Sequence, residues 1–172
     1  TGGSYAIRDG RLRVRGARNK PLWLKRTLPH DVRIEFDARS ESPEGDIKVE
    51  LFGDGVSKAE STSYVSTGYV VIFGGWHNTR NVIARMDEHG ADRVEGPPYK
   101  VVQGKTYRMK IERRGGMLRA WVDGLPEGRG GWLGALRDRQ VMQRRLREAR
   151  DEPGMFDAMR KSIARRASCR WI

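Results

Sequence analysis

The residues best suited to bind a ligand lie in one loop, Gly74-Gly-Trp-His-Asn-Thr79. Its aromatic ring, Trp76, could stack on the apolar C–H face of a sugar, while His77 and Asn78 could hydrogen-bond the sugar hydroxyls. The paired glycines would let a ligand approach the backbone closely. Three further side chains could complete such a site: Tyr64, Arg80 and Arg85. The alternative is an ordinary turn whose tryptophan folds back over the core.

The carboxylates of Glu35-Phe-Asp-Ala-Arg-Ser-Glu41 are spaced too widely for retaining glycoside hydrolysis, which needs carboxyl groups about 5 to 5.5 Å apart. On an extended strand, at about 3.3 Å per residue, the Cα atoms of Glu35 and Glu41 are about 20 Å apart. A solvated charged face opposite an apolar one explains the pattern better. The sequence therefore predicts no catalytic residues.

Metal ligands are poorly represented. The three histidines are widely spaced and belong to no ligand series, and the single cysteine rules out a cysteine-based cluster. Calcium is the remaining candidate, because one turn carries three carboxylates: Asp87, Glu88 and Asp92. An acidic turn is weak evidence for calcium without the geometry of its ligands, so we expect no metal and no cofactor.

Short runs with an apolar residue at every second position predict β-strands. The clearest covers residues 31–39, and residues 46–51 repeat the pattern, so we expect these two runs to be sheet neighbours. Further runs are expected at 5–8, 11–15, 22–24, 68–73, 81–86, 106–111 and 118–122. Turns at Asp9-Gly10 and at Arg113-Arg-Gly-Gly116 predict two hairpins. The apolar run 68–73 predicts a central strand that is covered on both faces.

About eight or nine strands at this spacing predict an all-β, two-sheet antiparallel sandwich over residues 1–124. Residues 125–172 differ, because apolar residues recur there at helical spacing among arginines, which predicts a basic helical tail. The tail holds 12 Lys and Arg against 6 Asp and Glu, while the rest holds 22 against 16. Such a tail could bind polyanions. No apolar run reaches about 18 residues, so no transmembrane helix is expected.

The order of three motifs resembles the concanavalin A-like lectin/glucanase superfamily: Pro21-Leu-Trp-Leu24, Gly68-Tyr-Val-Val-Ile-Phe-Gly-Gly-Trp76 and Leu118-Arg-Ala-Trp-Val-Asp-Gly124. Within it, residues 5–124 are most similar to bacterial laminin G-like domains and to family-16-like, 3-keto-disaccharide hydrolase-like domains. The resemblance implies a jelly-roll sandwich whose concave sheet and rim loops meet carbohydrate. It implies a non-catalytic carbohydrate-binding or cell-surface module outside the cytoplasm, or alternatively a glycoside-processing hydrolase.

Members of that superfamily continue after the Val-Asp-Gly turn with another strand, a loop and a closing strand, and none of these is visible in residues 125–172. A sandwich without its closing strand leaves backbone edges uncovered. Either the tail helices cover that edge, or a shifted reading frame in GC-rich coding DNA produced this Arg-, Gly-, Ala- and Met-rich end.

Overall fold

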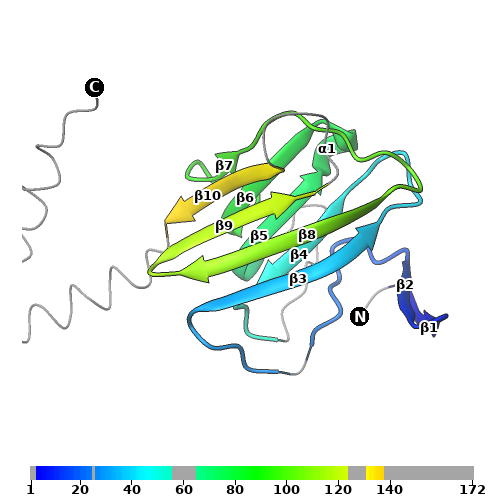
Figure 1. The fold of residues 1–172 in the computed structure, drawn as a ribbon, viewed down its shortest axis with the longest axis horizontal. Coiled ribbons are helices and arrows are strands. Elements are labelled where there is room, and N and C mark those ends of the chain that lie inside the picture. Colours follow the sequence, from blue (N-terminus) through cyan, green and yellow to red (C-terminus); the bar gives the residue numbers. More distant parts are fainter. Residues whose placement is uncertain (1–2, 25, 56–64, 124–130, 138–172) are drawn as a thin grey trace, which may run out of the picture. The chain divides into compact units, whose positions relative to one another are not determined.

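The chain forms an all-β structure. The computed structural model describes residues 3–24, 26–55, 65–123 and 131–137 (Figure 1). Within these ranges lie ten strands and one short turn element, α1 (Gly75–Asn78). The strands are β1 (Ser4–Arg8), β2 (Arg11–Arg15), β3 (Val32–Arg39), β4 (Ile47–Leu51), β5 (Val65–Gly74), β6 (Arg80–Asp87), β7 (Val94–Glu95), β8 (Thr106–Arg114), β9 (Met117–Val122) and β10 (Trp132–Arg137).

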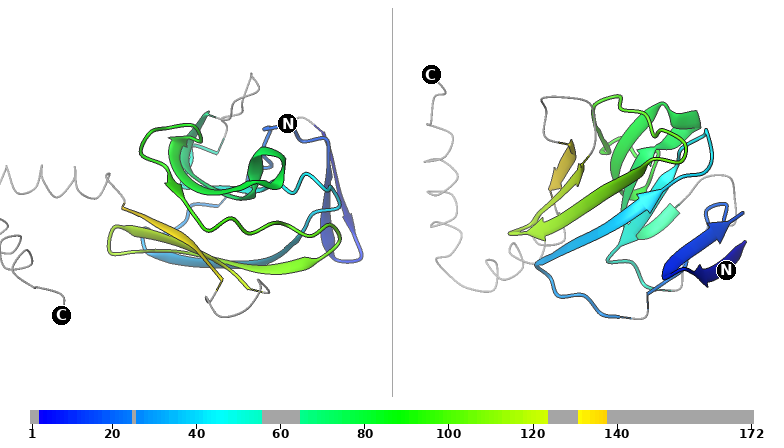
Figure 2. Two further views of the ribbon diagram at one scale, coloured as in Figure 1. Left: turned by 90° about the horizontal axis from the view of Figure 1, so that it is seen from above. Right: turned by 45° about the vertical axis from the view of Figure 1, so that its right-hand side comes forward.

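The strands form two four-stranded sheets and a separate β1–β2 hairpin. One sheet has the order β10-β9-β8-β3 and the other the order β4-β5-β6-β7. The two sheets lie face to face, and the β4–β7 sheet is curved so that its hollow side faces away from its partner (Figure 2, left). The expected antiparallel, two-sheet sandwich is therefore confirmed, and the hollow side is called the concave face below.

Strand β5 is buried on both sides. Tyr69, Val71 and Phe73 face the other sheet and belong to the main core, where they meet Met109, Ile111 and their neighbours. The alternate residues of β5 face the concave side and form a second apolar cluster with two residues of β6: Val70, Ile72, Val82 and Ala84. All of β5 from Tyr69 to Phe73 is at most 1% exposed. This confirms the expectation of a central strand covered on both faces.

Both predicted hairpins are present. Asp9 and Gly10 have φ values of 52° and 68° between β1 and β2, and Gly115 and Gly116 have φ values of 56° and 78° between β8 and β9. A two-residue hairpin turn with both central residues at positive φ matches the right-handed twist of the strands that it joins. The turn residues therefore fixed the register of these two hairpins.

The expected pairing of residues 31–39 with residues 46–51 is wrong. Phe36 in β3 lies opposite Met109 in β8, whereas Val49 in β4 lies opposite Val71 in β5, so the two runs belong to different sheets. Alternation shows which side of a strand is buried, but it does not show which strand lies beside it. Residues 22–24 form no strand, and Leu22 and Leu24 are exposed.

Strand β10 is part of one of the two sheets, so the sandwich continues beyond residue 124. This strand lies within the segment that was expected to be helical, so that expectation is wrong for residues 132–137. The compact unit covers Thr1–Leu136, Leu136 is only 6% exposed, and extended Gly134 lies against Val94 and Ile83. The spacing of Leu133 and Leu136, three residues apart, suggested a helix. Gly131 and Gly134 lack side chains, so they hid the alternation that is typical of a strand. Residues 138–172 lie outside the described residues. No helix in the described part of the chain is long and apolar enough to span a lipid bilayer.

Strand β10 should contribute to the cooperative stability of the sandwich. Leu136→Ala removes a buried side chain, so we expect the free energy of unfolding to fall by about 2–5 kcal/mol in denaturant titration. Arg137→Ala is the matched control, because Arg137 is exposed, and it should change stability by less than about 0.5 kcal/mol. Equal effects of the two substitutions would contradict the placement of β10.

Candidate functional site

The turn α1 places Trp76 on the concave face. Trp76, His77 and Asn78 have φ values of 49°, 55° and 61°, a left-handed conformation that is uncommon for residues other than glycine. The turn is closed by hydrogen bonds from Thr79 N to Gly75 O (2.9 Å) and from Thr79 Oγ1 to Trp76 O (2.6 Å). The chain thereby folds back, and the half-buried Trp76 packs against the concave apolar cluster of β5 and β6.

Asn78 holds this turn against two other loops. Its Nδ2 donates to Val101 O (2.7 Å) and Pro43 O (3.2 Å), while its Oδ1 accepts from Val101 N (2.8 Å). A Cβ atom at Gly45 or Gly74, both at φ 72°, would lie 2.9 or 2.7 Å from that same oxygen. The Asn78 amide is therefore engaged in holding the fold, and the two glycines leave room for it.

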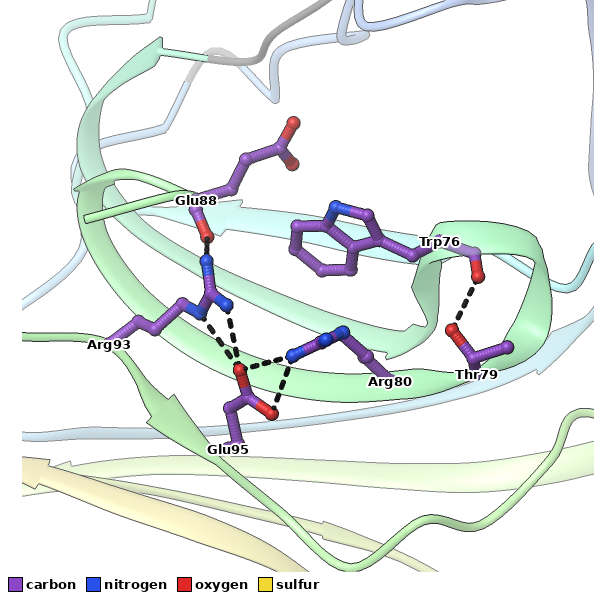
Figure 3. Close-up of polar contacts among 6 residues, drawn as sticks. All are labelled: Trp76, Thr79, Arg80, Glu88, Arg93 and Glu95. Carbon is purple, nitrogen blue, oxygen red and sulfur yellow. Dashed lines mark hydrogen bonds and ion pairs between the residues drawn. The ribbon is translucent and has the colours of Figure 1, made fainter. Parts of the chain in front are cut away.

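Trp76 is bordered by cationic and ionisable side chains. The His89 ring meets it edge to face at a centroid distance of 5.4 Å, and the Arg93 guanidinium lies 5.6 Å from its ring centroid. Figure 3 shows Arg93, Arg80 and Glu95 grouped beside the ring. Arg93 binds Glu95 Oε1 through Nη2 (2.7 Å) and Nε (3.1 Å), and it donates to Glu88 O (3.4 Å).

Glu95 connects two arginines on this face. Arg80 Nη1 contacts Glu95 Oε1 and Oε2 at 2.8 and 3.0 Å, in addition to the contacts of Arg93. The hydrogen bond from Arg93, and then the charge of Arg80, hold the pKa of Glu95 below its ordinary value. Glu95 therefore stays anionic and keeps Arg93 in place beside the indole ring.

A cavity of about 330 Å³ opens next to Trp76. Its lining residues are Asn19, Asp46, Lys48, Ile72, Gly75, Trp76, Glu88 and His89. Lys48 Nζ donates to Glu88 Oε2 (2.8 Å) and to Asn19 Oδ1 (3.0 Å), and the Glu88 side chain is only 7% exposed. The cavity therefore combines one aromatic wall with several groups that can donate or accept hydrogen bonds.

Asp46 differs from the other acidic residue of the cavity. Its backbone N–H donates to Gly74 O (2.8 Å), but its carboxylate has no hydrogen-bond or ion-pair partner among the described residues. Loss of hydration raises the pKa of Asp46 above its ordinary value, Lys48 opposes that rise, and the Glu88 charge adds to it. Although Asp46 as a whole residue is exposed, it borders the cavity and is available to a ligand.

The structure brings together only part of the predicted site. Trp76 and Arg80 lie on the concave face, whereas the strand alternation of β6 places Arg85 on the inner side, where Nη1 contacts Asp92 at 2.8 Å. The His77 side chain is 89% exposed, and its Nδ1 contacts the carboxylate of Glu44. Tyr64 lies outside the described residues.

The carboxylates considered for calcium are engaged elsewhere. Asp87 Oδ1 accepts from the backbone N–H of His89 (2.8 Å), Glu88 contacts Lys48, and Asp92 contacts Arg85. The described ranges contain no group of three or more His, Cys, Asp or Glu residues arranged to hold a metal ion. The turn at residues 87–92 instead supplies Glu88 and His89 to the cavity.

Sequence analysis did not assign six residues to this site, Asn19, Asp46, Lys48, His89, Arg93 and Glu95, and it considered Glu88 only as a calcium ligand. The polar side of the run 46–51 contained a usable signal, because that run alternates and its polar residues had to share one face. The contribution of residues 88–93 to the site could not be predicted in this way. These residues follow strand β6, and the direction of their side chains depends on the geometry of the turn.

The chain was compared with protein-family models, curated proteins and solved structures, and no match was found in any of the three. The fold and the candidate site therefore stand on the geometry described above.

The hydrogen bonds of Asn78 should be essential for the stability of the turn. Asn78→Ala leaves the backbone groups of Val101 without these partners and keeps a left-handed φ, so the free energy of unfolding should fall by about 2–4 kcal/mol in denaturant titration. His77→Gly is the control, because glycine relieves the same backbone conformation, and it should be neutral or stabilising. A large loss of stability in the control would contradict this account.

The pKa of Asp46 should respond to Glu88. Glu88→Gln removes a negative charge that raises the pKa of Asp46, so that pKa should fall toward the ordinary value. Carboxyl ¹³C chemical shifts followed against pH measure it directly. An unchanged or higher Asp46 pKa in this variant would show that the two carboxyl groups do not interact.

Proposed function

We propose that this protein is a non-catalytic carbohydrate-binding module with a jelly-roll sandwich of the concanavalin A-like kind. The observation that supports this most directly is the half-buried Trp76 ring on the concave face, bordered by a cavity with polar walls. Aromatic rings bind the C–H faces of sugars, and neighbouring polar side chains orient the hydroxyls. The concave face of β4–β7 supplies both.

The size and chemistry of the cavity fit a small, hydroxyl-rich ligand. A volume of about 330 Å³ is at the lower end of the range of ligand sites, about 300–1,000 Å³. Asn19, Lys48 and His89 offer amide, ammonium and imidazole groups around it. A single sugar ring placed against Trp76 would meet these groups along its edge, and the rest of a glycan would extend over the exposed rim.

The outer face of the other sheet supports a non-catalytic role for the carboxylates of β3. Arg108 contacts Glu35 Oε2 at 3.1 Å and Asp37 Oδ1 at 3.3 Å. These contacts raise the pKa of Arg108, with Glu35 contributing most. The carboxylates are thus paired with an arginine on a solvated face. The family resemblance also supports a cell-surface location for the proposed module, and the excess of arginine and lysine in residues 125–172 supports a tail that binds polyanions.

Trp76→Ala should weaken glycan binding by about tenfold or more, the effect expected for a central aromatic contact. A glycan array identifies the bound sugar, and isothermal titration calorimetry then measures its affinity. Trp121→Ala is the matched control, because Trp121 lies on the outer face of the opposite sheet, where Lys110 Nζ is 4.3 Å from its ring centroid. This control should bind as the unaltered protein does.

The bound oligosaccharide should be recovered intact after prolonged incubation. Cleavage would assign the chain to the glycoside-processing hydrolases instead. Equal losses of affinity in the Trp76 and Trp121 variants, or no glycan binding at all, would contradict a binding site on the concave face.

A further inference from the structure

We infer that the cavity beside Trp76 selects sugars that carry a protonated amine, such as glucosaminyl units, over the same sugars without a charge. This inference rests on the proposed function and specifies the ligand of the same site. It follows from the charges that line the cavity, from the position of Asp46 and from the aromatic wall.

The described lining carries an excess of negative charge. Two carboxylates, Asp46 and Glu88, lie around one ammonium, Lys48, and that ammonium is hydrogen-bonded to Glu88. His89 Nε2 also lies near Glu88, at 3.7 Å from Oε1. Arg93, beyond Trp76, is bound to Glu95. Among the described residues, the hydrogen bonds of Lys48 and Arg93 to carboxylates therefore go to Glu88 and Glu95, and of these two cations only Lys48 acts on Asp46, through its charge.

Asp46 is consequently the carboxylate that a ligand can neutralise. Its carboxylate has no hydrogen-bond or ion-pair partner among the described residues, and the loss of hydration that raises its pKa disfavours its anionic form when the cavity is empty. An ammonium group of a ligand would stabilise the anionic form of Asp46, because a charge-assisted hydrogen bond favours the anion. A neutral hydroxyl can donate to the same oxygen, but it brings no charge.

The aromatic wall is compatible with a cationic ligand. The negative face of an indole ring attracts cations, and the Arg93 guanidinium already lies 5.6 Å from the Trp76 centroid. An amino sugar presents an ammonium group next to apolar C–H groups, so it can contact Asp46 and Trp76 together. A sugar that carries a carboxylate would instead meet Asp46 and Glu88 as like charges.

This local preference is opposite to that expected from the whole chain. A net charge of +12 favours polyanions in general. Preference for an amine-bearing glycan would therefore arise from the cavity and not from the overall charge, which makes the two sources of binding separable by experiment.

The test uses three β-1,4-linked trisaccharides that differ at one position: the trimers of glucosamine, N-acetylglucosamine and glucose. Calorimetry of the full chain at slightly acidic pH, where the amine is charged, should give about tenfold or more tighter binding of the glucosamine trimer than of the glucose trimer, the effect of one hydrogen bond between charged groups. In Asp46→Asn this preference should fall to near parity, while binding of the neutral trimers persists.

Asp37→Asn is the matched control, because it removes the same charge from the outer face of the opposite sheet, and it should retain the full preference. Asp46→Asn should fold, since asparagine tolerates the φ of 57° found at this position. Its melting temperature should be equal to or above that of the unaltered protein, because the folded state disfavours the charged form of Asp46.

The outcomes separate this inference from the proposed function. Equal affinity for the amine-bearing and neutral trimers, or a preference that survives Asp46→Asn, would overturn the inference and leave carbohydrate binding intact. Failure of all three trimers and of a broader glycan array to bind would overturn both.

Discussion

The burial of β5 on both faces is the constraint on which the rest of the structure depends. An antiparallel sheet usually has one face on the core and the other in water. Here the concave face carries Val70, Ile72, Val82 and Ala84, each at most 1% exposed. Because exposure of such apolar side chains to water is unfavourable, another segment of the chain must cover them. The α1 turn and Trp76 do so in part, which explains why a tryptophan lies on that face.

The position of Trp76 has a cost that the surrounding loops offset. Three consecutive residues other than glycine are left-handed, a conformation that destabilises the chain at each one. The Asn78 amide compensates by satisfying both backbone groups of Val101, and Gly45 and Gly74 allow the loops to close around it. Asn78, which was predicted to hydrogen-bond a ligand, thus holds the scaffold, and Trp76, two residues earlier, forms the aromatic wall of the cavity.

The sequence predicted the strands better than their arrangement. Alternation at residues 31–39 and paired positive-φ residues at 9–10 and 115–116 are local signals, and each was confirmed. The order of strands within each sheet depends on which strand lies beside which, as for Val49 in β4 and Val71 in β5, and no local signal records it. Gly134 obscured β10 for a related reason, since a residue without a side chain adds nothing to a hydrophobic pattern. In the candidate site, Trp76 could be recognised by its chemistry, whereas Glu88 and His89 reach the cavity only because a turn redirects the chain.

Strand β4 serves the core and the cavity with alternate residues. Ile47 and Val49 pack against the inter-sheet core, while Lys48, between them, lines the cavity on the opposite side. The two sets of side chains are separated by the backbone of the sheet. Related chains could therefore diverge in what they recognise by exchanging the outward residues of this strand, with little penalty for folding. In this architecture, specificity is free to evolve at positions that the hydrophobic interior does not constrain.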